Sequence, residues 1–501
     1  MNLSELTSGC EGICRWQKDV NWEKDVSSIA ADSRKVVAGS VFVAFKGEYF
    51  DGHAFIDQAL QQGACAIILE DRAYCKEDEP WILVKDSRAI YGAMQQSWSG
   101  SPSLHMNVVG VTGTNGKTTV THMLACILEE AGKKTGLLGT IYNKVGERIL
   151  PADLTTPGSE ELAVLLRQMV QEQTDYVVME VSSHALDQSR TAGIEFDLAI
   201  FTNLSQDHLD YHHSIDEYRS AKAKLFSGLK PKGEKNRKKA AIINFDDKAG
   251  PIMAEFCRVP VITYGFGELS SLRADQVELS TAGIRYTLTY GSERHEIALK
   301  LHGRFNVYNS LAAIAAALVE GIEIQVIRRA LEKMEPVAGR FQQVSADGSR
   351  PPFDVFVDYS HTPDGLLHCL TTAKELCAGR IISVFGAGGH RDKTKRPMMG
   401  EVAARLSDIT VVTSDNPRDE EPMDIINDIL KGMDGATAKA KILTEPDRGK
   451  AIEIAMNAAL PGDIVLICGK GHEDYQIIGQ EKLPFDDYQF AQNMMVKTYK
   501  G

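Results

Sequence analysis

The sequence predicts an α/β protein of three domains: a small α/β domain, a central domain with a largely parallel sheet, and a Rossmann-like carboxy-terminal domain. Three observations support this prediction. The chain has 501 residues, which is too long for one hydrophobic core. Short apolar runs alternate with helical segments, as in parallel sheets that helices cover on both faces. A glycine-rich loop at residues 113–118 lies between an apolar run and a helical pattern, which is typical of a phosphate-binding loop.

We expect the domain boundaries near residues 106 and 338. Residues 1–106 contain the expected strands 40–45, 64–69 and 81–84. Residues 107–338 contain 176–180, 196–201 and 240–245, followed by an antiparallel hairpin from 283–290 and 297–301. Residues 339–501 contain 353–358, 380–385, 408–413 and 463–468. Each of these last four strands ends in a polar or glycine-rich turn, and carboxyl ends of parallel strands are where such sheets bind ligands.

Composition narrows the class of protein. The net charge of -13 argues against a general binder of nucleic acid or anionic membranes, because phosphate contacts need a basic face. The basic run 230–239 contains Pro and Gly and no aromatic residue, so we expect a solvated loop. No apolar run approaches the ~20 residues that span a bilayer, and the amino terminus lacks a secretory pattern. We therefore expect a cytoplasmic protein.

Cysteine usage agrees with this location. Nine cysteines are spread over the chain, which does not suggest a disulfide framework. Cys10 and Cys14 have the spacing of half a metal site, but no second Cys or His pair follows nearby. Free thiols are the preferred interpretation.

The segment Gly113-Thr-Asn-Gly-Lys-Thr118 carries the first chemical prediction. Backbone N–H groups of such a loop cradle phosphates, Lys117 reaches the terminal phosphates, and the Thr118 hydroxyl is placed for Mg²⁺. The usual pattern has Gly where this chain has Val111, so a purely structural turn is the alternative. We expect the chain to bind a nucleoside triphosphate.

Two further segments place polar groups beside this loop. Glu180 ends an apolar run, where it could hold Mg²⁺ or simply cap the strand. Residues 202–213 contain three His and two Asp, a spacing that permits zinc, although Mg²⁺ and phosphate fit the neighbouring loop better. Lys222 and Lys224 follow on an expected helix, and either would ordinarily be a surface residue.

Together these motifs resemble the Mur ligases, ATP-dependent enzymes that add amino acids to the UDP-linked precursor of peptidoglycan. The resemblance rests on Gly-Thr-Asn-Gly-Lys-Thr, Glu180-Val-Ser-Ser-His, Asn203-Leu-Ser-x-Asp-His-Leu-Asp and Tyr218-x3-Lys222-x2-Leu-Phe. The carboxy-terminal turns 358–364, 388–397, 415–418 and 469–473 extend it over essentially the whole chain, in the same order. These turns are similar to those of the family members that add meso-2,6-diaminopimelate.

The resemblance implies a reaction. ATP phosphorylates the D-glutamyl carboxylate of UDP-N-acetylmuramoyl-L-Ala-D-Glu, the amine of meso-diaminopimelate attacks the acyl phosphate, and phosphate leaves. Cations must offset the repulsion between the two anions in the first step. The implied catalytic residues are Lys117, Lys222 and His208. The implied ligands of two Mg²⁺ ions are Thr118, Glu180, His208 and Lys222, the last as a carbamate, with a bare lysine as the alternative. Lys224 would face another way on the helix.

The resemblance also implies three groups of binding residues. For ATP they are Gly113, Thr114, Asn115, Gly116, Lys117, Thr118, Thr119, Asn306, Arg340 and Asp358. For the UDP-linked dipeptide they are Ser33, Thr155, Thr156, Ser182, Gln188 and Arg190, with Glu48-Tyr-Phe50 departing from the His-Gln-Ala of some relatives. For diaminopimelate they are Arg391, Asp415, Asn416, Pro417, Arg418, Gly469 and Glu473. Asn306 would also suit the N-cap of a helix at 307–318.

Arg418 is the implied specificity residue. Diaminopimelate carries a second carboxylate at its far end, and an Arg can bind it through two parallel hydrogen bonds. A surface-loop role for Arg418 is the alternative. The expected partners are these small molecules and neither nucleic acid nor membrane, and the expected form is a monomer in cytoplasmic cell-wall synthesis, with its bearing on cell shape and division. Three other functions stay open: a lysine-adding ligase, a folylpolyglutamate synthetase, or a nucleotide-switch protein.

Overall fold

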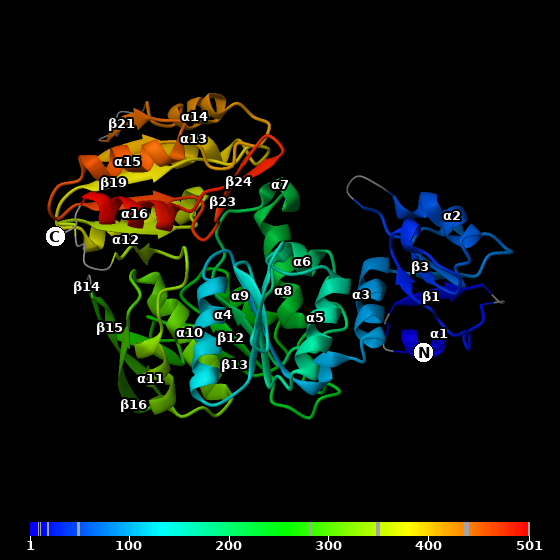
Figure 1. Cartoon of the computed structure of the whole chain (residues 1–501). Coiled ribbons are helices and arrows are strands. Elements are labelled where there is room, and N and C mark those ends of the chain that lie inside the picture. Colours follow the sequence, from blue (N-terminus) through cyan, green and yellow to red (C-terminus); the bar gives the residue numbers. More distant parts are fainter. Residues whose placement is uncertain are drawn as a thin grey trace.

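The computed structural model confirms the predicted fold class (Figure 1). It describes residues 1–8, 10, 12–17, 20–47, 51–280, 282–346, 351–434 and 440–498, with 209 and 210 described by their backbone alone. The segment Glu48–Phe50, where the sequence departs from some relatives, lies outside the described residues. None of the helices in the described parts combines the length and apolar character needed to cross a lipid bilayer.

The first domain is built on a five-stranded sheet in the order β1-β5-β4-β3-β2. Its strands are β1 (Ile13–Trp16), β2 (Ile29–Ala30), β3 (Val41–Val43), β4 (Ala66–Leu69) and β5 (Trp81–Val84). β1 is antiparallel to β5, and the remaining pairs are parallel. Its helices are α1 (Leu3–Thr7), α2 (Ile56–Gln61) and α3 (Ser87–Trp98). α3 packs against α5 (Ser159–Gln171) of the central domain, so it joins the two domains (Figure 1).

The central domain contains an eleven-stranded sheet in the order β16-β15-β14-β13-β12-β11-β6-β10-β7-β8-β9. The seven strands of its parallel part are β6 (Asn107–Thr112), β7 (Thr135–Leu138), β10 (Tyr176–Glu180), β11 (Leu198–Phe201), β12 (Ala240–Asn244), β13 (Val261–Gly265) and β14 (Leu272–Ser280). The antiparallel ends are β8 (Tyr142–Val145) with β9 (Arg148–Pro151), and β15 (Gly283–Tyr290) with β16 (Glu293–Leu299).

Helices cover both faces of this sheet because its strands alternate their apolar side chains between two cores. On one face Val109 and Val111 of β6 pack in a core with α4 (Lys117–Glu130), α10 (Phe305–Val319) and α11 (Ile324–Lys333). On the other face Val108 packs in a core with α5, α6 (Ser183–Asp187), α8 (Ile215–Ser227) and α9 (Gly250–Glu255). The short helix α7 (Leu209–His212) precedes α8.

The carboxy-terminal domain has a six-stranded sheet in the order β17-β18-β22-β19-β20-β21. Its strands are β17 (Gln342–Gln343), β18 (Asp354–Asp358), β19 (Ile381–Phe385), β20 (Ile409–Val412), β21 (Lys441–Thr444) and β22 (Ile464–Cys468), and β17 alone among them is antiparallel to its neighbour. Helices α12 (Pro363–Leu376), α13 (Lys395–Leu406) and α14 (Pro422–Leu430) cover one face, and α15 (Arg448–Ala458) and α16 (Asp487–Thr498) cover the other. A separate hairpin of β23 (Tyr475–Ile478) and β24 (Glu481–Pro484) follows β22.

Two local predictions were wrong. The helix expected at 307–318 begins at Phe305 with Arg304 as its N-cap, so Asn306 lies inside α10 and is not its cap. The basic run 230–239 is not wholly solvated, since Lys235 and Lys239 are buried and paired with Asp197 and Glu195. The high charge of the run suggested a surface loop. The prediction was wrong because the acidic partners lie some forty residues earlier in the chain. All nine cysteines are free thiols, as expected.

Candidate active site

The phosphate loop joins β6 to α4 and has the backbone geometry that such a loop needs. Gly113 has a φ of 153° and Gly116 a φ of 86°. A Cβ atom at Gly113 would lie 1.9 Å from Thr202 Oγ1, so no larger residue fits there. The Nζ atom of Lys117 donates hydrogen bonds to the backbone oxygens of Gly113 and Thr114, at 3.0 and 2.9 Å. The loop is therefore folded around its own lysine.

Thr118 and Glu180, which the resemblance assigns to Mg²⁺, are in contact. The Thr118 hydroxyl donates to Glu180 Oε2 at 3.0 Å, and Glu180 is 1 % exposed at the end of β10. Glu180 Oε1 also accepts from the backbone N–H of Thr140, at 2.8 Å, and Oε2 accepts from the Thr140 hydroxyl at 3.1 Å. A buried carboxylate and a hydroxyl at the phosphate loop are hard oxygen donors, which fits Mg²⁺. The turn of Thr140 carried no sequence signal, and its role was missed.

Lys222 is buried, and Lys224 is not. The Lys222 Nζ atom donates to the backbone oxygen of Gly113 at 2.8 Å and lies 4.2 Å from the ring centre of Tyr218. Burial holds the pKa of Lys222 well below its usual range, and the charge of Lys117 lowers it further. Lys224 points outward to Asp187, 2.9 Å away. The two lysines thus face different ways, as expected for positions i and i+2 of a helix.

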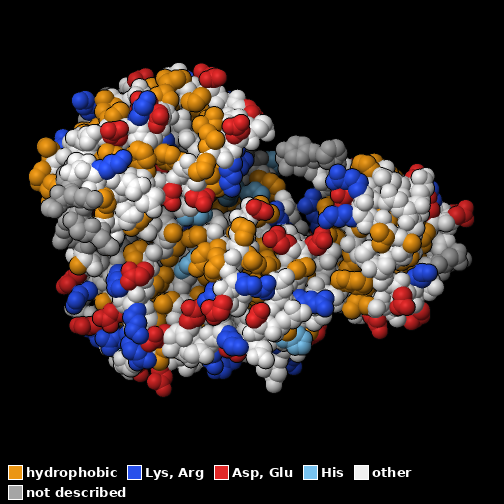
Figure 2. All heavy atoms as spheres, viewed as in Figure 1, with side chains coloured by type: hydrophobic (Ala, Val, Ile, Leu, Met, Phe, Trp, Pro, Cys, Tyr) orange, Lys and Arg blue, Asp and Glu red, His pale blue; other side chains and the backbone are white. Residues whose placement is uncertain are grey.

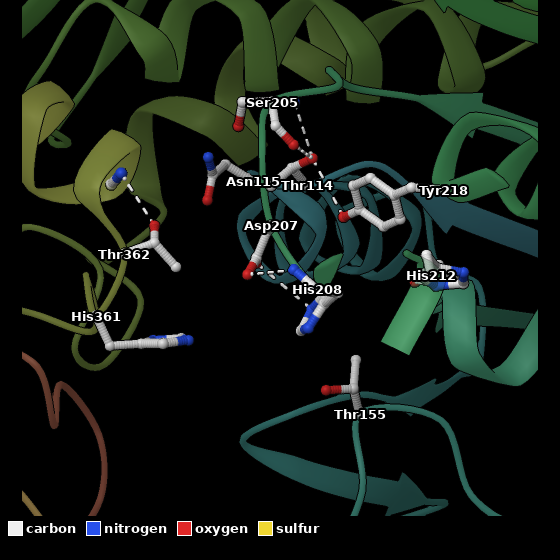
Figure 3. Close-up of polar contacts among 12 residues, drawn as sticks. Thr114, Asn115, Thr155, Ser205, Asp207, His208, His212, Tyr218, His361 and Thr362 are labelled. Carbon is white, nitrogen blue, oxygen red and sulfur yellow. Dashed lines mark hydrogen bonds and ion pairs between the residues drawn. The ribbon is translucent and has the colours of Figure 1, made fainter. Parts of the chain in front are cut away.

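His208 faces the space between the central and carboxy-terminal domains. Figure 3 shows Asp207 and His208 on one side of this space, His361 on the other, and Thr155 beneath them. His208 has a left-handed backbone with a φ of 55°, and burial lowers its pKa to about 4. Within the described ranges no three His, Cys, Asp or Glu side chains gather to hold a metal, so the zinc alternative has no support there.

A cavity of about 460 Å³ lies between the phosphate loop and the carboxy-terminal domain. Of the residues predicted for ATP, it is lined by Asn115, Gly116, Thr118, Thr119, Arg340 and Asp358. Arg340 Nη2 donates to the Thr118 hydroxyl at 2.9 Å, which connects the two domains. Asp358 Oδ2 accepts from the backbone N–H of Phe341 at 2.7 Å. This cavity has the position and donors for a nucleotide.

Asn306 does not line this cavity, whereas Asn309 does. Asn306 is 1 % exposed, donates to the backbone oxygen of His302 at 2.8 Å, and accepts from Asn309 Nδ2 at 2.8 Å. Asn306 therefore orients Asn309, which meets the loop at Gly116. The spacing i, i+3 on a helix was the available signal for Asn309, and the sequence reasoning missed it.

A second cavity of about 740 Å³ adjoins the first. The residues predicted for diaminopimelate that line it are Arg391, Asp415, Asn416, Arg418, Gly469 and Glu473. Pro417 is buried and does not line it. Glu473 Oε2 accepts from Asn416 Nδ2 and from Lys470 Nζ, both at 2.9 Å. His208 lines the same cavity from the central domain, so both halves of the predicted chemistry meet there.

Arg418 is anchored at one end of its guanidinium. Its Nη1 donates to the backbone oxygen of Gly389 at 2.8 Å, and its backbone has a left-handed φ of 54°. The β23 hairpin holds that backbone, because Arg418 N donates to Ile477 O at 3.1 Å. Among the described residues Nε and Nη2 make no hydrogen bond, so they remain available to a ligand in the cavity.

Four of the six residues predicted for the dipeptide substrate, Thr156, Ser182, Gln188 and Arg190, form one network. Arg190 donates to Gln188 Oε1 through Nε and Nη2, and to Thr156 O through Nη1 at 3.0 Å. The Thr156 hydroxyl contacts Ser182 at 3.3 Å, and Thr155 accepts from Thr140 at 3.1 Å. Ser33 lies apart, in the first domain, where its hydroxyl donates to Gln58 at 3.0 Å.

Basic side chains gather where the three domains face one another. Figure 2 shows Lys and Arg side chains around the hollow between the first domain and the rest, with His side chains deeper inside it. Asp and Glu side chains also lie along part of its rim, so both signs of charge face the hollow. The Lys and Arg side chains there can attract anionic ligands, including phosphates.

Known proteins resemble the chain over nearly its whole length. Residues 25–97 match the model "Mur ligase family, catalytic domain", 111–317 match "Mur ligase middle domain", and 339–471 match "Mur ligase, glutamate ligase domain". The UDP-N-acetylmuramoyl-L-alanyl-D-glutamate–2,6-diaminopimelate ligase of Geobacillus kaustophilus is 44% identical, covering 92% of this chain and 93% of that protein. The ligase of the same name from Caldanaerobacter subterraneus subsp. tengcongensis is 40% identical over 100% of both chains. A solved structure of a ligase of that name has a TM-score of 0.70 and 30% identity, covering 99% of both chains.

Proposed function

The chain belongs to the Mur ligase family, and from that premise we propose that it joins 2,6-diaminopimelate to UDP-N-acetylmuramoyl-L-Ala-D-Glu at the expense of ATP. The product is an amide, and ADP and phosphate are released. The enzyme is an ATP-dependent acid–amino-acid ligase of peptidoglycan synthesis. A lysine-adding ligase, a folylpolyglutamate synthetase and a nucleotide-switch protein are not favoured, because relatives at 40–44% identity carry the diaminopimelate name.

One observation carries the proposal. The second cavity has His208 and Asp207 on its central-domain wall and Arg391, Arg418 and Glu473 on its carboxy-terminal wall. An acyl phosphate formed beside the phosphate loop and an incoming amine can therefore meet in one space. The two arginines supply cations for the carboxylates of diaminopimelate, and Glu473 supplies an anion for its far ammonium group.

The chemistry requires two anions to approach each other. We assign Lys117 to the terminal phosphate, where its charge offsets the repulsion between ATP and the D-glutamyl carboxylate. The carboxylate oxygen attacks the γ-phosphorus, and the bond to ADP breaks. The amine, once it has lost a proton, attacks the acyl carbon, and phosphate leaves with the electron pair of the broken C–O bond. Mg²⁺ would supply further charge neutralisation, and Thr118, Glu180 and His208 are the residues proposed to hold it.

The environment of Lys222 supports the proposed carbamate. A carbamate forms when a neutral amine attacks CO₂, and burial favours the neutral amine at Lys222. The carbamate has negatively charged oxygen atoms, which suit a second Mg²⁺. Its nitrogen is neutral and amide-like, so no charged ammonium group is buried. The surface residue Lys224 has no comparable environment.

The remaining assignments are proposed together. The ATP and diaminopimelate residues are those given above, with Asn309 added for the nucleotide, and Ser33, Thr155, Thr156, Ser182, Gln188 and Arg190 are assigned to the UDP-linked dipeptide. Domain boundaries at residues 106 and 338, two Mg²⁺ ions, a cytoplasmic location and a monomeric state also belong to the proposal.

A release assay for ADP tests the function. The purified chain, ATP, Mg²⁺ and UDP-N-acetylmuramoyl-L-Ala-D-Glu are mixed in parallel with diaminopimelate, L-lysine or L-glutamate. We expect release with diaminopimelate and little with the other two. A preference for lysine would contradict the substrate, and release independent of any amino acid would contradict the ligase reaction itself.

A further inference from the structure

Asp364 in the first turn of α12 connects the carboxy-terminal domain directly to the phosphate loop. Its Oδ2 atom accepts a hydrogen bond from Asn115 Nδ2 at 3.1 Å and another from Ser205 Oγ at 2.7 Å. Asn115 is a residue of the phosphate loop, and Ser205 lies in the segment that follows β11. One carboxylate oxygen of one domain therefore holds two segments of another.

This contact lies at the boundary between the two cavities. Asp364 and Ser205 line both the nucleotide cavity and the cavity proposed for the amino acid. Their hydrogen bond consequently lies where the two spaces adjoin. A group at this boundary can affect the alignment of ligands in both cavities at once.

The Ser205 segment transmits the contact further into the central domain. The backbone N–H of Ser205 donates to Thr114 Oγ1 at 3.0 Å, and the Thr114 hydroxyl is 3.2 Å from the hydroxyl of Tyr218 (Figure 3). The ring of Tyr218 in turn packs against the amine of Lys222. A continuous chain of contacts thus runs from Asp364 to a residue proposed for metal binding.

Holding Asp364 there has an electrostatic cost. The neighbouring carboxyl group of Asp247 has a raised pKa, mainly because of burial and in part because of Asp364. Two like charges near each other repel, so the donors Asn115 and Ser205 must offset that repulsion. This balance requires both donors to be correctly aligned, which makes the contact sensitive to the arrangement of the loop.

We propose that Asp364 is a positioning residue that aligns the phosphate loop and the Ser205 segment when the carboxy-terminal domain is docked. The inference rests on the proposed ligase function. It assigns to Asp364 no contact with a reacting atom. Asp364 acts through Asn115 and Ser205, and its removal loosens the alignment of the two cavities while leaving the nucleotide-binding loop intact.

The test compares Asp364→Asn and Ser205→Ala with a matched control, Asp424→Asn. Asp424 also lies in the first turn of a helix that begins with Pro, α14 of the same domain, and it is exposed. Both Asp→Asn changes remove the same favourable interaction with a helix N-terminus. They differ in that Asp364 bonds to another domain through Oδ2, and its Oδ1 lies 3.4 Å from His368 Nε2 of the same helix. Steady-state kcat and KM are measured by ADP release, and the binding of a non-hydrolysable ATP analogue is measured by calorimetry.

For Asp364→Asn we expect kcat to fall at least about tenfold, because charge-assisted hydrogen bonds are roughly twice as strong as neutral ones. The dissociation constant of the analogue should change less than about threefold, since the phosphate loop keeps its own backbone geometry. Ser205→Ala should lower kcat in the same direction, and the double variant should be no slower than Asp364→Asn alone, because both changes remove one contact. Asp424→Asn should keep kcat within about twofold of the unchanged enzyme.

Several results would overturn the inference: an unchanged kcat in Asp364→Asn, equal losses of kcat and analogue binding, or effects of the two changes that multiply in the double variant. An equal loss in Asp424→Asn would attribute the effect to the helix terminus instead. Thermal melting checks folding, and if Asp364→Asn does not fold, Ser205→Ala carries the same test. Failure of the unchanged enzyme to release ADP with diaminopimelate would contradict the function and is thereby distinguished from failure of this inference.

Discussion

Replacing Arg418 by Lys tests the proposed recognition of diaminopimelate. The positive charge is retained, but the planar fork of the guanidinium is lost. In the structure Nη1 is already occupied by the backbone oxygen of Gly389, and Nε and Nη2 are the donors left for a ligand. A lysine at this position could offer the far carboxylate a single contact in place of two.

The expected loss follows from that difference of one charge-assisted hydrogen bond. Such a bond contributes about 1.5–3 kcal/mol, and each 1.36 kcal/mol corresponds to a factor of ten. We therefore expect kcat/KM for diaminopimelate to fall roughly ten- to hundredfold in Arg418→Lys. The KM for ATP should stay within about twofold, since Arg418 does not line the nucleotide cavity.

The assay is ADP release at varied diaminopimelate and, separately, at varied ATP, with L-lysine as a competing substrate. Lysine lacks the far carboxylate, so its slow rate should be nearly unchanged and the preference for diaminopimelate should shrink. Arg405→Lys serves as the control, because Arg405 is an exposed residue in the last turn of α13. Equal increases in the KM for ATP and for diaminopimelate would indicate a general distortion and refute the proposed role of Arg418.

Three further changes test other parts of the site. Lys222→Ala should lower kcat by more than about a hundredfold, because a metal contact contributes several kcal/mol. ATP binding should remain measurable by calorimetry. Undiminished turnover would contradict the proposed carbamate. Gly113→Ala should abolish binding of an ATP analogue, since the added Cβ would collide with Thr202, and tight binding would show that the loop geometry is not required. Glu420→Gln should destabilise the fold at pH 7 but much less near pH 2, as urea unfolding can show. A hydrogen bond from Arg396 lowers the pKa of Glu420 to about 2, so its stabilisation is present above the ordinary pKa and lost as the pH falls toward 2; an equal effect at both pH values would refute this.

The sequence was sufficient to predict the parallel sheets and the loops at their carboxyl ends. Strand predictions succeeded because buried parallel strands are continuous apolar runs, such as 464–468, and their ends are marked by Gly or polar residues. The contact between Thr118 and Glu180 was predictable for the same reason. β6 and β10 are neighbouring parallel strands, so the loop that follows β6 and leads to Thr118 must lie beside Glu180 at the end of β10.

Contacts between domains could not be predicted from the sequence. Asp364 belongs to the motif at 358–364, and nothing in its local pattern indicates that it bonds to Asn115, 249 positions away. The burial of Lys235 could not be predicted either. Its neighbours in the sequence are mostly charged, but its amine pairs with Asp197 inside the fold. The distinction between Asn306 and Asn309 depends on which side of α10 faces the nucleotide cavity, and this is set by how the helix packs on the sheet.

The separate first domain has a consequence for which molecules the enzyme accepts. It meets the rest of the chain where α3 packs on α5, and Lys35, in the same short helix as Ser33, pairs with Glu160 of α5 at 3.6 Å. Ser33 itself does not line the second cavity. An acceptor held at Ser33 must therefore reach from the first domain into the second cavity for its peptide end to be activated. The length of the acceptor then contributes to selectivity, in addition to its functional groups. A sugar nucleotide with a shorter peptide could bind at Ser33 and still place no carboxylate in the second cavity.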